Sequence, residues 1–305
     1  MTRFWRTLPV FCACLENNHV MHAALPNVAF ARMPFREGNF RPAINVLEPA
    51  SMSPSIHTRE NREFATETKF LIDLAAASEI LDWGRANLAP DPHAGGGSLD
   101  TYQITSLYFD TEQFDVFHRR GSFGRSKYRI RRYGSGGVAF LERKLKTRGL
   151  LTKRRSIVKL EEIERLSDAN SNRDWAGHWF HQRLLARQLR PVCQITYLRT
   201  ARVAMTNHGP IRLTMDERVR ALPLSDLVFK NAEEGTALSE SRIILELKYR
   251  VEMPTLFKPL LESFGLVPQP VSKYRLAAAA LGLVADFAPP PHDSAATAPT
   301  LCALG

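Results

Sequence analysis

Apolar and polar positions alternate between residues 61 and 285, and this period of two predicts mainly β-strands. The segment 64–72 (FATETKFLI) is the first to alternate. Residues 74–88 have helical spacing instead, and Pro90 and the glycines at 95–97 follow where that helix would end. Later strands are predicted over 102–110, 126–133, 138–146, 153–160, 191–203, 211–219 and 243–250, and later helices over 175–188, 256–264 and 273–283.

Turn residues join several of the predicted strands. The glycine-rich segment 134–137 and the pair Arg148-Gly149 lie where β-hairpins would reverse direction. Mostly antiparallel strands with few helices predict an α+β fold whose sheet is closed or nearly closed.

The two ends of the chain lack this pattern. Residues 1–60 are rich in Pro, Asn and Arg and are predicted to be a disordered extension, or an over-extended gene start, because Met33 and Met52 precede the first patterned segment. The apolar stretch 8–15 crudely mimics a signal peptide, but Pro9 interrupts it and no clear cleavage site follows. Residues 286–305 are predicted to form a disordered tail, which leaves one domain over 61–285.

Composition adds a preference for an anionic partner. The 305 residues carry a net charge of +10, which leaves nucleic acid, a membrane surface and a small polyphosphate open as partners. The four cysteines form no CxxC pair, so neither a disulfide framework nor a zinc site is indicated. No apolar run approaches the ~18 residues that span a bilayer. We therefore expect a cytoplasmic protein, whose membrane partner, if it has one, is a separate chain.

Most of the positive charge lies in one segment. Residues 121–160 contain thirteen Lys or Arg residues and a single acid, Glu142. Lys127, Arg129 and Arg131 recur at every second position, so on a strand they share one face. For a lone strand, the simplest interpretation of such a face is that it is exposed to solvent.

Other predicted strands repeat the pattern with single acids among the bases. Arg212 alternates with Asp216 along IRLTMDE, and Glu246 alternates with Lys248 along the otherwise apolar IILELKYR. An exposed face does not need carboxylates placed singly among bases. An enclosed polar cavity does, because phosphates bind Arg and Lys while carboxylates bind a divalent metal. The pattern therefore favours a cavity over a solvated face.

Nine motifs together resemble the VTC domain, the polyphosphate-polymerase domain of the triphosphate tunnel (CYTH-like) superfamily. The resemblance covers about 64–283, and the motifs follow the order found in that family. They are ETKF (67–70), SLYFDT (106–111), KYRIRRY (127–133), FLERK (140–144), TKRRS (152–156), ITYLRTAR (195–202), IRLTMDE (211–217), ILELKY (244–249) and SKYRLA (272–277).

The resemblance implies an antiparallel eight-stranded β-barrel tunnel with flanking helices. It also implies that the terminal phosphate of ATP is transferred to inorganic polyphosphate with a divalent metal, Mn²⁺ or Mg²⁺. Glu246 resembles the metal-binding carboxylate, and Tyr197 and Ser272 resemble the hydroxyl contacts. The residues that resemble the basic tunnel positions are Lys69, Arg129, Arg131, Lys144, Lys153, Arg199 and Lys273.

Strand phase alone adds further candidates: Lys127, Arg155, Arg212, Asp216 and Lys248. We expect Lys69, Arg129, Arg131, Lys144, Arg199 and Lys273 to act on the transferred phosphate, with the other bases and the hydroxyls binding the nucleotide and polymer. Asp216 would assist Glu246 in holding the metal. Glu67 is either a metal ligand or a partner for a nearby base. Phosphoryl transfer needs this kind of positioning and charge neutralisation more than a covalent nucleophile.

Three other functions stay open. A tunnel-fold triphosphatase or nucleoside-triphosphate hydrolase would usually carry a fuller ExExK motif, whereas Ala65 stands two residues before Glu67. A non-catalytic polyphosphate-binding module would need only the basic cavity. Nucleic-acid binding is disfavoured because the basic segment lacks an exposed aromatic platform.

Overall fold

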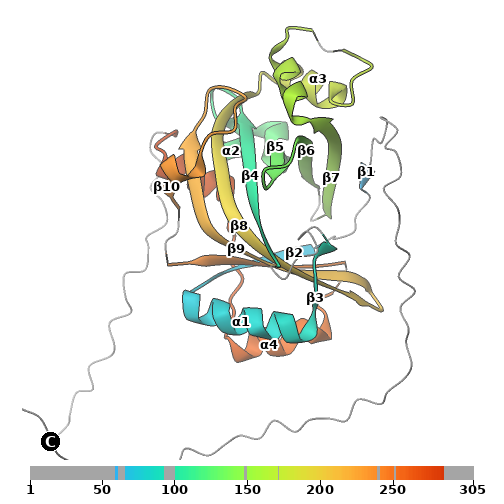
Figure 1. Ribbon diagram of the computed structural model, residues 1–305, viewed down its shortest axis with the longest axis vertical. Coiled ribbons are helices and arrows are strands. Elements are labelled where there is room, and N and C mark those ends of the chain that lie inside the picture. The colour runs from blue at the N-terminus through green and yellow to red at the C-terminus, as the bar shows by residue number, and fades with distance from the viewer. Residues whose placement is uncertain are drawn as a thin grey trace, which may run out of the picture. The chain divides into compact units, whose positions relative to one another are not determined.

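The strands of this chain form one curved antiparallel sheet with helices on both sides (Figure 1). The computed structural model describes residues 59–60, 66–92, 100–147, 150–170, 172–238, 241–250 and 252–284, all within the unit Met52–Gly305. The expected extension over 1–60 and the tail over 286–305 lie outside the described residues, apart from Arg59–Glu60, which form a short strand. In the described part of the chain, no helix combines the length and apolarity needed to span a bilayer.

The sheet is open, which corrects the closed barrel expected above. Among the described residues it has 11 strands in the order β1-β7-β6-β5-β4-β8-β9-β11-β2, with β10 added on β9 and β3 on β8. The path ends at β1 and β2, and no described pairing joins these two strands. Lys144 of β6, two strands in from the β1 edge, reaches Glu67 of β2 at 2.8 Å across the interior of the curved sheet.

The long strands are close to those predicted from alternation, and the short strands were not predicted. The long strands are β2 (Thr66–Ile72), β4 (Thr101–Asp110), β5 (Ser126–Tyr133), β6 (Val138–Thr147), β7 (Leu150–Lys159), β8 (Arg190–Thr206), β9 (Gly209–Pro223) and β11 (Ile243–Tyr249). The short ones are β1 (Arg59–Glu60), β3 (Ala89–Pro90) and β10 (Thr236–Ala237).

Local capping explains where two helices begin. The Asp73 carboxylate accepts a hydrogen bond from the amide of Ala76 at 2.8 Å, so helix α1 begins directly after β2. Ser272 caps α5 in the same way through the amide of Arg275. The helices are α1 (Leu74–Asn87), α2 (Asp115–His118), α3 (His178–Ala186), α4 (Lys258–Ser263) and α5 (Lys273–Ala280), and 3-10 turns include η2 (Gly121–Arg125) and η3 (Leu160–Ser167).

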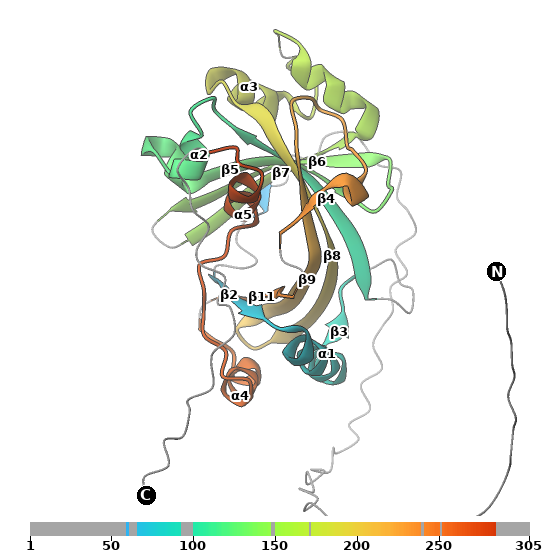
Figure 2. The ribbon, with the colours of Figure 1, turned by 90° about the vertical axis from the view of Figure 1, so that its left-hand side faces the viewer.

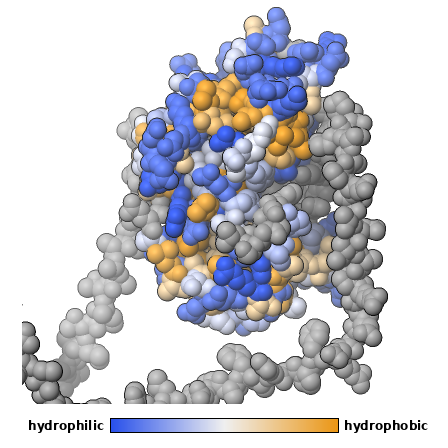
Figure 3. Space-filling view, viewed as in Figure 1, coloured by the Kyte–Doolittle hydropathy of each residue, from blue (hydrophilic) through white to orange (hydrophobic). Residues whose placement is uncertain are grey.

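Two apolar cores hold the helices against the sheet. One packs α3, through Trp179 and Phe180, onto the side of β4 and β5 that carries Leu107 and Ile130. The other joins α1 and α4 to β2 and β11, and hydrophilic residues cover much of the lower end of the molecule, where α1 lies (Figures 1 and 3). Figure 2 shows α5 on the concave side of the sheet. The side chains on the other face of these strands therefore line a polar interior.

Candidate functional site

The basic residues of alternate strand positions converge on a cavity of about 90 Å³ inside the curved sheet. Twelve of the sixteen predicted site residues line it, with Tyr108 and Tyr274 added. The predicted residues that line it are Glu67, Lys69, Lys127, Arg129, Arg131, Lys144, Tyr197, Arg199, Glu246, Lys248, Ser272 and Lys273. Lys153, Arg155, Arg212 and Asp216 do not. Glu142 pairs with Lys153 and Arg155, and Asp91 pairs with Arg212, whereas Asp216 contacts two bases of the lining from outside it.

Glu246 is the carboxylate around which the lysines of the cavity gather. Its carboxylate lies 2.9 Å from Lys248, 3.1 Å from Lys69 and 3.2 Å from Lys273, and it is 4% exposed. Burial alone would raise the pKa of Glu246, but Lys248, Lys69 and Lys273 hold that pKa well below its usual value. Among the described residues, every charged group within ion-pair distance of the buried Glu246 carboxylate is therefore basic.

Glu67 extends this network toward the edge of the sheet. Lys69 lies 3.0 Å from Glu67 as well as 3.1 Å from Glu246, and Lys144 lies 2.8 Å from Glu67. Register explains the arrangement, because Lys69 is directly opposite Glu246 on the paired strands β2 and β11. Glu67 thus acts as a partner for nearby bases in this structure, and its role as a metal ligand stays a prediction.

Asp216 lies behind the cavity wall rather than in it. Arg199 contacts it through two hydrogen bonds of 2.6 and 2.7 Å, and Lys273 forms an ion pair with the same carboxylate. Asp216 is fully buried, and the two bases hold its pKa below the usual value despite the burial that opposes them. Asp216 therefore orients two cavity cations, which a strand pattern alone does not distinguish from metal binding.

Glu142 holds three bases and was missed as a site residue. It is 1% exposed and lies between Arg129 and Arg155 in the register of β5, β6 and β7. Its carboxylate is 2.7 Å from Arg129, 2.7 Å from Arg155 and 3.1 Å from Lys153. The same carboxylate thus contacts one base of the cavity lining, Arg129, and two bases outside it, Arg155 and Lys153. The signal was visible in the sequence, because Glu142 is the only acid among the thirteen bases of 121–160.

Arg212 was placed in the cavity by strand phase, and the structure places it elsewhere. Its guanidinium pairs with the buried carboxylate of Asp91 and donates to the Tyr102 hydroxyl at 3.0 Å. Asp91 lies just after β3, in a segment with no periodicity, so the sequence pattern did not predict this pair. Arg212 therefore ties the β3 region to β9 instead of facing the cavity.

Hydroxyl groups fix the remaining cavity bases. Arg131 donates to the Tyr197 hydroxyl at 3.1 Å, Arg129 donates to the Tyr108 hydroxyl at 3.2 Å, and Lys127 donates to Ser272 at 2.9 Å. These contacts hold the donors of both arginines in the cavity wall before any ligand arrives. Such preorganised donors are the arrangement that stabilises developing negative charge at low reorganisation cost.

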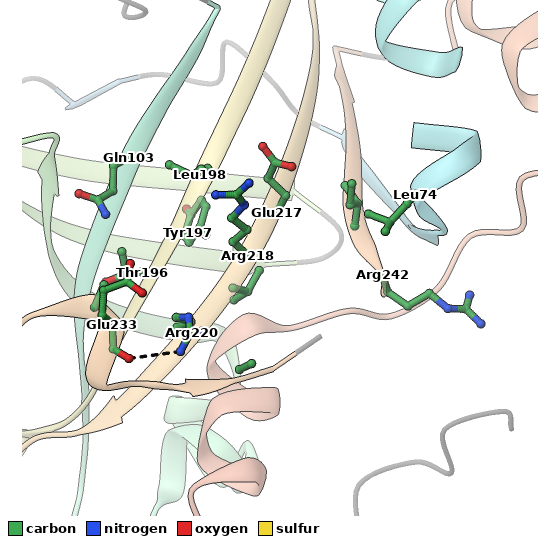
Figure 4. Close-up of a pocket in the computed structure, with 14 residues that line it drawn as sticks. Leu74, Gln103, Thr196, Tyr197, Leu198, Glu217, Arg218, Arg220, Glu233 and Arg242 are labelled. Carbon is green, nitrogen blue, oxygen red and sulfur yellow. Dashed lines mark hydrogen bonds between the residues drawn. The ribbon is translucent and has the colours of Figure 1, made fainter. Parts of the chain in front are cut away.

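A β-bulge in β9 lies beside a second groove, which shares only Tyr197 with the cavity lining. Register shifts between Thr196 and Leu198 of β8, and Arg218 adopts a positive φ of 51° in the opposing strand. Glu217 and Arg218 then line a groove of about 520 Å³ that Figure 4 shows, in which Arg220 donates to the Glu233 carbonyl. This mixture of acids and bases differs from the cavity, where bases dominate.

The carboxylates offer a metal only a partial set of protein ligands. In the described part of the chain, no group of three or more His, Cys, Asp or Glu side chains is placed to hold a metal ion. Glu67 and Glu246 do lie on either side of the Lys69 ammonium group. Mg²⁺ and Mn²⁺ commonly take one or two carboxylates and complete their coordination with water and substrate phosphates. The residues therefore fit a metal shared with a phosphate ligand better than a metal held by protein alone.

Lys127 gives the cavity an expected dependence on pH. Burial, together with Lys69 and Lys144, lowers the pKa of Lys127 to about 7. Near pH 8 this lysine is mostly neutral, and an anion bound beside it would favour its charged form, so anion binding there is expected to take up about one proton. Tripolyphosphate affinity should therefore fall as pH rises from about 6 to about 8.

Calorimetric titration in buffers of different ionisation enthalpy measures this proton uptake. Lys127→Met should remove about one proton of uptake near pH 8, while Lys258→Met on the exposed side of α4 should leave it unchanged. Equal uptake by wild type and Lys127→Met would contradict the assignment. Because tripolyphosphate titrates identically in every sample, the difference between proteins isolates the lysine.

The fold and the cavity define an anion-binding α+β protein. Its basic cavity lies inside a curved antiparallel sheet that is not closed into a barrel. The chain belongs to the family described as the VTC domain, whose family model matches residues 64–282. This membership supports a protein that handles phosphoryl groups. A search of curated proteins found no match to the chain.

Several solved structures are similar at low identity. A candidate adenylate cyclase from Bacillus halodurans is 15% identical, with a TM-score of 0.44, over 69% of this chain and 95% of its own. A candidate adenylyl cyclase from Hippeastrum, described as having a dominant triphosphatase activity, is 15% identical, with a TM-score of 0.40, over 68% of this chain and 92% of its own. A protein from Pyrococcus horikoshii is 13% identical, with a TM-score of 0.38, over 69% and 97%.

Proposed function

We propose that this chain is a polyphosphate polymerase that transfers the γ-phosphoryl group of ATP to the end of a polyphosphate chain inside the cavity. The observation that carries the proposal is the lining itself, in which eight Lys and Arg side chains face two carboxylates, Glu67 and Glu246. Such an excess of fixed, buried cations is unfavourable unless a multiply charged anion occupies the space. A chain of phosphates presents that charge at every unit.

In the proposed reaction, the terminal oxygen of the polyphosphate chain attacks the γ-phosphorus of ATP. A new P–O bond forms, the bond to the β–γ bridging oxygen breaks, and ADP leaves with the charge of that oxygen. Arg129 and Arg131 are positioned to neutralise the transferred group, because Tyr108 and Tyr197 already orient their guanidinium groups. Lys69, Lys144, Arg199 and Lys273 then provide charge along the rest of the cavity.

Glu246 is the residue that would hold a divalent metal, with Glu67 as a second carboxylate. A metal bound there supplies charge neutralisation on phosphate oxygens of the leaving group. Asp216 supports this site indirectly by holding Arg199 and Lys273. No protein nucleophile is needed in this scheme.

Purified protein should move radiolabel from γ-labelled ATP into acid-insoluble polymer when Mn²⁺ and a polyphosphate primer are present. Arg131→Gln should lower the rate on the order of 100-fold, because it removes a fixed donor from the transferred phosphate. The control is Arg190→Gln, an exposed residue that does not line the cavity. Protein that binds the primer without elongating it would leave a binding module, and rapid phosphate release from tripolyphosphate would indicate a hydrolase.

A further inference from the structure

The cavity opens into a second space of about 310 Å³, which we call the vestibule. The two spaces share five lining residues, Glu67, Lys69, Lys127, Lys144 and Ser272, so they are contiguous. The vestibule adds four bases that do not line the inner cavity, namely Arg119, Arg125, Lys146 and Arg275. Glu67 is the only acid in its lining.

The bases of the vestibule differ from those of the inner cavity in how their charge is balanced. Inside, carboxylates contact most of the bases, as Glu246 and Glu67 contact Lys69. Among the described residues, by contrast, Arg119, Arg125 and Lys146 form no ion pair. Three bases at this mouth therefore have no carboxylate partner among the described residues.

The loop that carries two of these bases is closely built. Arg119 has a positive φ of 58°, a conformation that costs free energy for a residue with a side chain. A Cβ added to Gly124 would lie 2.5 Å from the Arg119 carbonyl oxygen, so only glycine fits there. Across the vestibule, the Arg275 guanidinium lies 5.1 Å from the centre of the Phe117 ring. The backbone of the loop at Arg119 and Gly124 is therefore closely constrained, and the Phe117 ring packs against Arg275 on the opposite wall.

The inner cavity and the vestibule also differ in size. The inner cavity measures about 90 Å³ and the vestibule about 310 Å³. A short phosphate chain can place its charges among the inner bases alone, whereas a longer chain must continue through an opening. The vestibule continues the basic lining in the direction of β5 and β6, where Lys127 and Lys144 belong to both spaces.

We propose that the vestibule is a binding subsite for the part of a polyphosphate chain that extends beyond the inner cavity, and that it makes the protein selective for long chains over tripolyphosphate. This inference rests on the proposed function, because it assumes that the inner cavity binds phosphate chains. The recognising groups are Arg119, Arg125 and Lys146, with Arg275 on the opposite wall. Their contacts are charge-assisted and bind phosphate oxygens without regard to sequence or base.

The test compares binding of tripolyphosphate and of long-chain polyphosphate to three proteins at one fixed salt concentration. The vestibule triple variant carries Arg119→Asn, Arg125→Gln and Lys146→Gln, with asparagine chosen because it tolerates positive φ. The matched control, Arg173→Asn, Arg190→Gln and Lys258→Gln, removes the same three charges from exposed positions that line neither space. Thermal unfolding of all three proteins verifies that each is folded.

The vestibule triple should bind long-chain polyphosphate about tenfold more weakly than wild type, since three exposed bases no longer contact the chain. Its affinity for tripolyphosphate should stay within about twofold, and the control should match wild type for both ligands. An equal loss for both ligands, or a wild type that binds long chains no more tightly than tripolyphosphate, would overturn the inference alone. A wild type that binds neither ligand would overturn the proposed function with it.

Discussion

Replacing Glu246 with glutamine is expected to reduce polymer synthesis from ATP on the order of 100-fold. The amide keeps the shape of the side chain but removes the charge that Lys69, Lys248 and Lys273 share. It also removes the carboxylate assigned to the metal, so the loss should persist at high Mn²⁺. The measurement is the initial rate of label incorporation over a range of Mn²⁺ concentrations.

Ligand binding separates a chemical role of Glu246 from a structural one. Without metal, Glu246→Gln should bind tripolyphosphate at least as tightly as wild type, because a competing carboxylate is gone from beside three ammonium groups. The control is Glu217→Gln, which makes the same change in the groove of Figure 4, outside the cavity lining. Loss of tripolyphosphate binding together with loss of synthesis would indicate a collapsed cavity and refute the assigned role.

Alternation was sufficient to predict the strands that build the cavity. The strand predicted over 126–133 is the strand observed, and the same phase places Lys127, Arg129 and Arg131 together on the cavity wall. This works because a period of two is a property of a single strand and needs no knowledge of its neighbours. The same logic correctly placed Glu246 and Lys248.

Alternation failed where the outcome depended on neighbouring strands. Arg155 has the right phase, but it pairs with Glu142 of the adjacent strand and does not line the cavity. Arg212 has the right phase as well, but Asp91 reaches it from a segment without periodicity. Closure of the sheet is a similar case, because it depends on whether the edge strands pair, and no described pairing joins β1 to β2.

The carboxylates divide into two kinds once their partners are known. Glu67 and Glu246 line the cavity, where a ligand phosphate could take over their contacts with the lysines. Glu142 and Asp216 lie outside the lining and hold arginines in place from behind. Carboxylates on the strands thus serve either to line the cavity beside the ligand or to position the bases that contact the ligand.

Replacing Glu142 with glutamine is therefore expected to affect folding most. Arg129, Arg155 and Lys153 would keep their buried positions without a counter-charge, which should lower the free energy of unfolding by about 3 kcal/mol. Denaturant unfolding of wild type and variant measures the difference. Tripolyphosphate should recover part of it, because Arg129 lines the cavity and gains a phosphate partner there.

The pH dependence of stability tests the same assignment independently. Burial would raise the pKa of Glu142, but Arg129, Arg131 and Lys153 hold it well below the ordinary value of 4.5. A carboxyl whose folded pKa is depressed contributes stability above its unfolded pKa and loses it as pH falls toward the folded pKa. Wild type should therefore lose more stability than Glu142→Gln as pH is lowered from about 5 to about 3. Parallel losses in both proteins would mean that Glu142 does not hold these bases, and that Arg129 is positioned in the cavity by Tyr108 alone.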